Sequence, residues 1–205
     1  MKILLAFAIF GVTAFAADPR IIFSKSFPGS VPAYVKITLL QSGEATYQEA
    51  VDEEPEKFTV ESASVATMFE LAGKLDHFQR PIESGLKVAK TGDKLFRWED
   101  GGASSEAKFN YSTDLDARAL LDWFERIAES ERMYADLERT IRFDRLGVDE
   151  VLVRITKMWD QKRFVSGNQF LPMLDRIAKN DSFLHMAREK AASLADGIRG
   201  LRANP

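Results

Sequence analysis

The hydrophobic pattern of this chain changes once, near residue 112, and this change limits the folds that the chain can adopt. Before it, apolar and polar residues alternate in short runs separated by glycine and proline, as in β-strands. After it, apolar residues recur every three or four positions, as in amphipathic helices. We therefore predict an α+β protein, with a mostly antiparallel sheet and one packed helix in residues 17–112, followed by a long helix and a helical bundle in residues 113–205.

The first half is expected to contain short strands around one helix. Ser62 is expected to cap this helix, whose apolar residues would face the sheet. The loop FPGSVPAY, residues 27–34, leads into a strand pattern. An anion-binding loop would lead into a helix, so we interpret this loop as a turn. The predicted strands cover residues 20–27, 34–39, 45–48, 57–60, 86–89, 94–98 and 106–111.

The second half is expected to consist of helices. The first would run from residue 113 or 114 to about residue 146, and others would follow Asp149, Ser166 and Asp181, with Pro172 either kinking the third or marking a later start. The last helix carries a narrow apolar seam suited to close antiparallel packing. Acid–base pairs four residues apart are expected to stabilise the long helix: Asp114 with Arg118, Asp122 with Arg126, and Glu138 with Arg142.

The first sixteen residues have the pattern of a secretory signal peptide. Lys2 precedes an apolar run that ends in Ala14-Phe15-Ala16, and the run is shorter than the ~20 residues that a membrane-spanning helix needs. We predict cleavage after Ala16 and a soluble secreted or periplasmic protein without a membrane span after signal removal. The chain has no cysteine, which excludes a bacterial lipid anchor, a disulfide and a thiolate nucleophile.

The ionisable residues give little support to a reactive site. The formal net charge of −3 does not favour nucleic acid as a partner. His77 and His185 lack metal-ligand spacing and are expected to have structural or surface roles. The acidic run Asp52–Glu56 lacks the spacing of a calcium loop and is interpreted as a solvated turn.

Two further motifs are also interpreted as structural. Ser84 and Lys87 match Ser-x-x-Lys, but the surrounding residues indicate a strand, whereas that motif needs a helix. The bases Arg139, Arg142 and Arg145 alternate with acids and are expected to form a salt-bridged solvent face. We therefore assign no catalytic, cofactor-binding or metal-binding residues.

Short motifs in the sheet region also match a known pattern. They are Pro32-Ala33-Tyr34 before a strand, the Ser42-Gly43 hairpin, Tyr47, and the aromatic helix-end turn Leu75-Asp76-His77-Phe78. These motifs resemble an uncharacterised domain family of exported bacterial proteins, which often begins Cys-x-Gly-x-Cys-Pro-x-Tyr, then a strand, an Asp-Gly turn and a Val-x-Tyr strand. Phe27 and Val31 stand at its two cysteine positions, so the resemblance, over roughly residues 22–130, implies the fold and export without a redox role.

Three functions agree with these features. We favour a non-catalytic protein-interaction module of the bacterial envelope, whose partner would be another envelope or secreted protein. The first alternative is an envelope hydrolase with a site built from Glu99, Asp100 and His77. The second is a carrier of a small apolar ligand held between the sheet and the helices.

Overall fold

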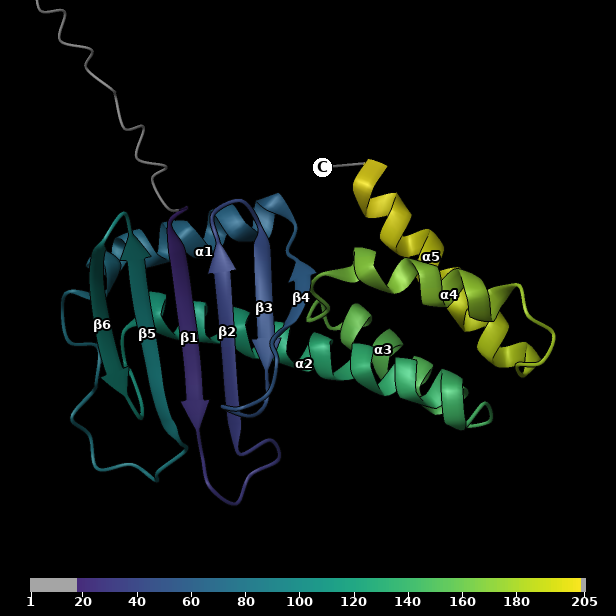
Figure 1. Cartoon of the computed structure of the whole chain (residues 1–205), viewed down its shortest axis with the longest axis horizontal. Coiled ribbons are helices and arrows are strands. Elements are labelled where there is room, and N and C mark those ends of the chain that lie inside the picture. Colours follow the sequence, from purple (N-terminus) through teal and green to yellow (C-terminus); the bar gives the residue numbers. More distant parts are fainter. Residues whose placement is uncertain (1–17, 204–205) are drawn as a thin grey trace, which may run out of the picture.

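The computed structural model of the chain describes residues 18–203, so the predicted signal peptide lies outside the described residues. The predicted α+β class is confirmed. One six-stranded antiparallel sheet, in the order β4-β3-β2-β1-β5-β6, is followed along the chain by a helical region (Figure 1). The strands are β1 (Arg20–Ser26), β2 (Tyr34–Leu40), β3 (Glu44–Gln48), β4 (Glu56–Thr59), β5 (Asp93–Asp100) and β6 (Ala103–Phe109).

One long helix links the two parts of the molecule. Its first half lies behind the sheet beside α1, and its second half continues into the group of remaining helices (Figure 1). We call the sheet with these covering helices the sheet lobe, and the rest the helical lobe. Within residues 18–203, no helix combines enough length with enough apolar character to cross a membrane. The helices are α1 (Ser62–Lys74), η1 (Asp76–Phe78), α2 (Leu115–Phe143), α3 (Val148–Asp160), η2 (Gly167–Phe170), α4 (Leu171–Ala178) and α5 (His185–Ala203).

Each lobe has its own hydrophobic core. In the sheet lobe, Phe124 of α2 stacks on Phe23 of β1, with 5.1 Å between ring centroids, and lies 5.9 Å from the ring of Phe96. In the helical lobe, fully buried Leu137 of α2 belongs to the core formed with α3, α4 and α5. The pattern changes from strand to helix near residue 112, as predicted, whereas the two cores meet further along, inside α2.

One predicted strand is wrong. Residues 81–92 contain no regular secondary structure, so the expected strand at residues 86–89 does not form. Leu86 and Val88 are 58% and 43% exposed. Pairing of this segment with the sheet would have buried little apolar surface, too little to offset the conformational entropy lost by ordering the chain. The segment is held instead by Glu83, whose carboxylate accepts the Asn110 N–H at 2.6 Å.

The helix boundaries differ from the expected ones at two places. Ser62 does not cap α1, because Glu61 occupies the N-cap position and makes no capping hydrogen bond through its side chain. Pro172 lies in the first turn of α4, so the second of its two expected roles is the correct one. A proline is tolerated there because the first N–H groups of a helix have no acceptor within it.

Candidate functional site

A groove of about 520 Å³ lies where the two lobes meet. Its walls come from the first turn of α1, the middle of α2, the end of α3, residues 164–168 and residue Ile198 of α5. We call this the lobe groove. It is the candidate functional site, because concave, partly apolar sites at the junction of two packed units are where ligands most often bind.

Aromatic side chains form much of the groove wall. Trp159 and Phe164 meet edge to face, with ring centroids 6.2 Å apart, and Trp123 comes from α2. The ring of Trp159 lies close against α5 because residue 197 is glycine. A Cβ atom at Gly197 would come within 2.9 Å of that ring.

Arg126 is the one basic residue of the groove wall. Its guanidinium lies 4.1 Å from the ring centroid of Trp123, and its Nη2 donates to the carbonyl oxygen of Lys162 at 2.7 Å. It makes no salt bridge with any carboxylate of residues 18–203, and its buried Nε has no hydrogen-bond partner there. Burial lowers the pKa of Arg126 from its ordinary value. The groove therefore contains a cation without a paired acid.

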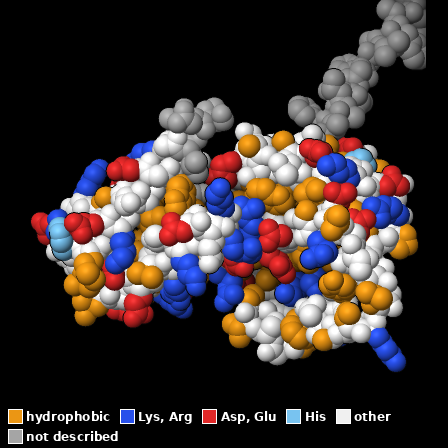
Figure 2. Space-filling view, turned by 180° about the vertical axis from the view of Figure 1, so that it is seen from behind, with side chains coloured by type: hydrophobic (Ala, Val, Ile, Leu, Met, Phe, Trp, Pro, Cys, Tyr) orange, Lys and Arg blue, Asp and Glu red, His pale blue; other side chains and the backbone are white. Residues whose placement is uncertain are grey.

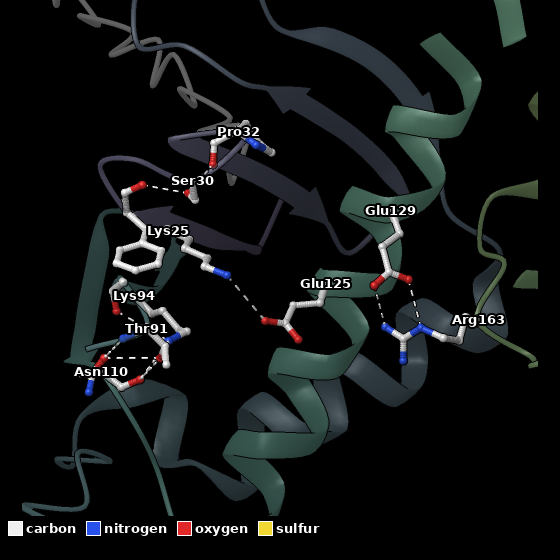
Figure 3. Close-up of polar contacts among 11 residues, drawn as sticks. Lys25, Ser30, Pro32, Thr91, Lys94, Asn110, Glu125, Glu129 and Arg163 are labelled. Carbon is white, nitrogen blue, oxygen red and sulfur yellow. Dashed lines mark hydrogen bonds and ion pairs between the residues drawn. The ribbon is translucent and has the colours of Figure 1, made fainter. Parts of the chain in front are cut away.

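The expected pairing of Arg126 with Asp122 is wrong. Asp122 instead accepts from Arg163 Nη1 at 2.9 Å. The same guanidinium donates to both carboxylate oxygens of Glu129, at 2.9 and 3.0 Å (Figure 3). Arg163 therefore pairs with two acids, Asp122 and Glu129, from one face of α2. These hydrogen bonds raise the pKa of Arg163 above its ordinary range.

The other two expected pairs of the long helix had different outcomes. The pair of Glu138 with Arg142 is confirmed, at 2.6 Å. The pair of Asp114 with Arg118 is wrong, because Asp114 accepts from Arg80 at 2.7 Å and from the N–H groups of the first turn of α2. Asp114 is thus the N-cap of α2.

The first turn of α1 forms part of the groove wall. Ser62, Ala63 and Ser64 line the groove, and no acidic side chain lies in this turn. The carboxylate of Glu61, which also lines the groove, accepts the N–H of Ser166 at 3.1 Å and does not cap the helix. The first N–H groups of a helix carry partial positive charge. This end of α1 therefore adds hydrogen-bond donors to a groove wall that also carries the opposite charges of Arg126 and Glu61.

A segment of the helical lobe closes one side of the groove. We call residues 162–169 the strap. Besides Arg163, three of its groups bond to α2: the Lys162 carbonyl oxygen accepts from Arg126, the Val165 N–H donates to Ser130 Oγ at 3.0 Å, and Gln169 Nε2 donates to Glu131 Oε1 at 2.7 Å. Blue and red side chains lie together at the centre of the molecule, where the lobes join (Figure 2).

Glu131 is an unusual carboxyl group in this junction. It is 2% exposed, and Gln169 donates its single hydrogen bond from a side chain. Burial, with smaller contributions from Glu56 and Glu61, raises its pKa to about 8. Glu131 is therefore largely protonated at neutral pH.

Unsatisfied polar atoms concentrate beside the groove. Among residues 18–203, five buried side-chain nitrogen or oxygen atoms lack a hydrogen-bond partner. Arg126 Nε and Asn168 Oδ1 belong to groove residues, and Ser166 Oγ belongs to the strap between two of them. Unpaired buried groups are costly, so these atoms are candidates for hydrogen bonds to water or to a bound molecule.

Two lysines lie side by side at the base of the sheet, but they have structural partners. Lys25 and Lys94 are opposite each other on β1 and β5. Lys94 is 5% exposed, and its Nζ donates to Thr91 Oγ1 at 2.9 Å and to the Asn110 carbonyl oxygen at 2.8 Å (Figure 3). Burial and then the charge of Lys25 lower the pKa of Lys94. Because these acceptors hold the ammonium, we infer that Lys94 has a structural role and connects the segments that contain Thr91 and Asn110.

The loop of residues 27–33 is a turn, as predicted. The Phe27 N–H donates to the Ala33 carbonyl oxygen at 2.8 Å, which closes the connection between β1 and β2. Ser30 Oγ lies 2.7 Å from the carbonyl oxygens of both Phe27 and Pro32, inside the loop (Figure 3). β2 begins directly afterwards, at Tyr34, so no helix N-terminus points at this loop.

Glu53, Glu54 and Glu56 of the acidic run line a second cavity, of about 420 Å³, beside α2. Arg132 and Arg139 also line this cavity, and Arg132 approaches Glu49 at 3.6 Å. Within the described part of the chain, no group of three or more His, Cys, Asp and Glu side chains is arranged to hold a metal ion. We interpret this cavity as a solvated surface with mixed charges.

The alternative acid site is not assembled. The His77 ring packs on Trp98, with centroids 4.4 Å apart, whereas Glu99 lies on the opposite face of β5 and pairs with Arg97 at 2.8 Å. Arg20, which hydrogen-bonds to Glu99, lowers the pKa of that carboxyl, so it is not a proton donor near neutral pH.

The remaining candidates also lie apart. Ser84 Oγ donates to Glu83 at 3.1 Å in the irregular segment and has no lysine partner. His185, on the surface at the start of α5, is 3.2 Å from Glu189. No protein-family model, no curated protein and no solved structure matches the chain. The lobe groove is therefore interpreted from its own geometry, and the resemblance to an exported family stays a prediction.

Proposed function

We propose that this chain is a non-catalytic protein-interaction module of the bacterial envelope, and that the lobe groove is its binding site. The observation that carries the proposal is the composition of the groove wall, where Trp123, Trp159 and Arg126 lie together. Tryptophan and arginine are the residues most enriched among those that dominate binding energy in protein interfaces. The partner would insert side chains between these residues.

The arrangement supports binding more than catalysis. The groove wall contains one acid, Glu61, and its carboxylate is engaged by the Ser166 N–H. Neither serine at the start of α1 has a hydrogen bond to a base. A nucleophile that acts at neutral pH needs such a base within reach. Export is proposed from the sequence of residues 1–16 alone.

The volume of the groove favours a second candidate function. About 520 Å³ lies within the range of small-molecule sites, roughly 300–1,000 Å³. The chain would then carry a small amphipathic molecule between the lobes. In that case the purified chain would contain an extractable small molecule, and groove substitutions would reduce its amount.

Affinity capture from envelope extract tests the proposal. Trp159→Leu and Arg126→Gln are expected to reduce recovery of the captured protein at least about tenfold, because each removes an anchor residue. The matched control is Phe143→Ser, which changes a side chain that is 82% exposed at the far end of α2. We expect it to capture as much as the unchanged chain.

Two results would contradict the proposal. One is full recovery by both groove variants when circular dichroism shows that they are folded. The other is loss of recovery with Phe143→Ser, which would place binding at the end of the helical lobe. A groove-dependent small molecule without any captured protein would favour the second candidate function.

A further inference from the structure

We infer that the lobe groove binds the C-terminal end of a partner polypeptide, through its free carboxylate and an apolar final side chain. The inference rests on the proposed function and specifies the chemistry of the partner. It follows from three features of the same groove. These are the donors of Arg126 and of the first turn of α1, the unpaired acceptor Asn168 Oδ1, and the apolar walls.

The carboxylate would be bound by Arg126 and the first turn of α1. Arg126 has no acid partner among the described residues, although it is held in place by Trp123 and by the Lys162 carbonyl oxygen. Guanidinium groups bind carboxylates through charge-assisted hydrogen bonds, which are about twice as strong as neutral ones. The amides of Ser62, Ala63 and Ser64 add donors on the adjoining wall.

The apolar side chain would lie between the aromatic rings. Trp159 and Phe164 form one side, and Ile198 and Trp123 line the same groove. Burial of one leucine or phenylalanine side chain in such surroundings stabilises a complex, because its apolar surface is removed from water. The groove therefore offers an apolar site beside a cationic one, as an apolar C-terminal residue requires.

Asn168 favours a peptide over a fatty acid or other simple amphiphile. Its Oδ1 is a buried acceptor without a donor. The last residue of a peptide carries an N–H group beside its terminal carboxylate, and this group would donate to Oδ1 if the Asn168 side chain turned toward the groove. A fatty acid has a carboxylate and an apolar tail but no donor, so it would gain nothing from Asn168 Oδ1 and should bind more weakly than the peptide.

Glu61 gives the inference a second, independent consequence. Its carboxylate lines the groove and would repel a bound carboxylate, while its hydrogen bond from Ser166 can be kept by the neutral amide of glutamine. Glu61→Gln should therefore tighten binding of a peptide with a free C-terminus. If the groove instead bound an amine, the same substitution would weaken binding.

The test uses three probes on the purified chain: the peptide N-acetyl-Gly-Ala-Leu-Phe as the free acid, the same peptide as its C-terminal amide, and decanoate. Binding is followed by tryptophan fluorescence in a Trp98→Phe background. This background removes Trp98, which lies outside the groove wall with its ring centroid 5.6 Å from that of Phe69, and leaves the two groove tryptophans as reporters.

The three probes are expected to bind with different affinities. The free acid should bind at least about tenfold more tightly than the amide and than decanoate. Arg126→Gln should reduce the preference for the acid to less than about threefold, and Glu61→Gln should increase affinity for the acid by about threefold.

Equal affinity for acid and amide, or for acid and decanoate, would overturn the inference. Weaker binding of the acid by Glu61→Gln would also overturn it. If no probe binds while Trp159→Leu still abolishes partner capture, only the C-terminal inference fails. If capture is also insensitive to the groove variants, the proposed function fails as well.

Discussion

Replacing Phe124 by alanine is expected to lower the free energy of unfolding by about 3–5 kcal/mol, the usual cost of removing a buried phenylalanine. The Phe124 side chain is fully buried, and it joins α2 to the sheet through its contacts with Phe23 and Phe96. Equilibrium denaturation with urea, followed by circular dichroism, measures the change. The variant is expected to keep the slope of the transition and to move its midpoint.

Phe143→Ala is the matched control, because Phe143 belongs to the same helix but is 82% exposed. It should change the free energy of unfolding by less than about 0.5 kcal/mol. Similar losses for both variants would mean that α2 does not pack on the sheet as described.

Replacing Glu131 by glutamine is expected to stabilise the protein at alkaline pH. Burial raises the pKa of Glu131 from its ordinary value of 4.5 to about 8, so the folded state binds a proton that the unfolded state has released between these pH values. The stability of the unchanged chain should therefore fall as pH rises through this window. Glutamine keeps an acceptor for Gln169 and cannot ionise.

Above pH 8 we expect the Glu131→Gln variant to be more stable by about 2–4 kcal/mol, and near pH 4 to be about equal to the unchanged chain. Thermal and urea unfolding at several pH values measure the difference. Glu138→Gln is the control, since Glu138 is exposed and pairs with Arg142; it should change stability by less than about 1 kcal/mol at every pH. A Glu131→Gln effect that does not depend on pH would contradict the burial of an ionisable group at the junction.

The fold class follows from local patterns, and this is why the sequence predicts it. Alternation places Ile21 and Phe23 on the covered face of β1, with Ile22 between them on the other face. The turn with Gly43, whose φ is +95°, forms between β2 and β3 as expected. The strand expected at residues 86–89 fails because alternation alone does not show whether another strand will cover the residues.

The candidate site could not be predicted in the same way, because it depends on contacts between distant residues. The spacing of Asp122 and Arg126 predicts a local pair, but Arg163, 41 positions after Asp122, takes its place. Glu61 and Ile198 meet in one groove although one precedes α1 and the other lies in α5. Trp159 falls in the helix predicted after Asp149, but helical periodicity does not show that its ring lines an open groove.

The alternative acid site fails for a physical reason that strand geometry supplies. Neighbouring residues of a strand point to opposite faces. Since Trp98 packs against His77 on the covered face, Glu99 must lie on the other face. Strand alternation therefore separates Glu99 from His77, whereas Glu99 and Asp100 line a common cavity at the end of β5.

Hydrogen exchange of the chain with and without its captured partner tests the central claim most directly, because it reports which backbone amides the partner protects. The account predicts slower exchange at residues 62–65, at the start of α1, and along the strap at residues 162–169, with little change in β6. Protection confined to the open face of the sheet or to the far end of α2, with unchanged exchange at the groove, would contradict it.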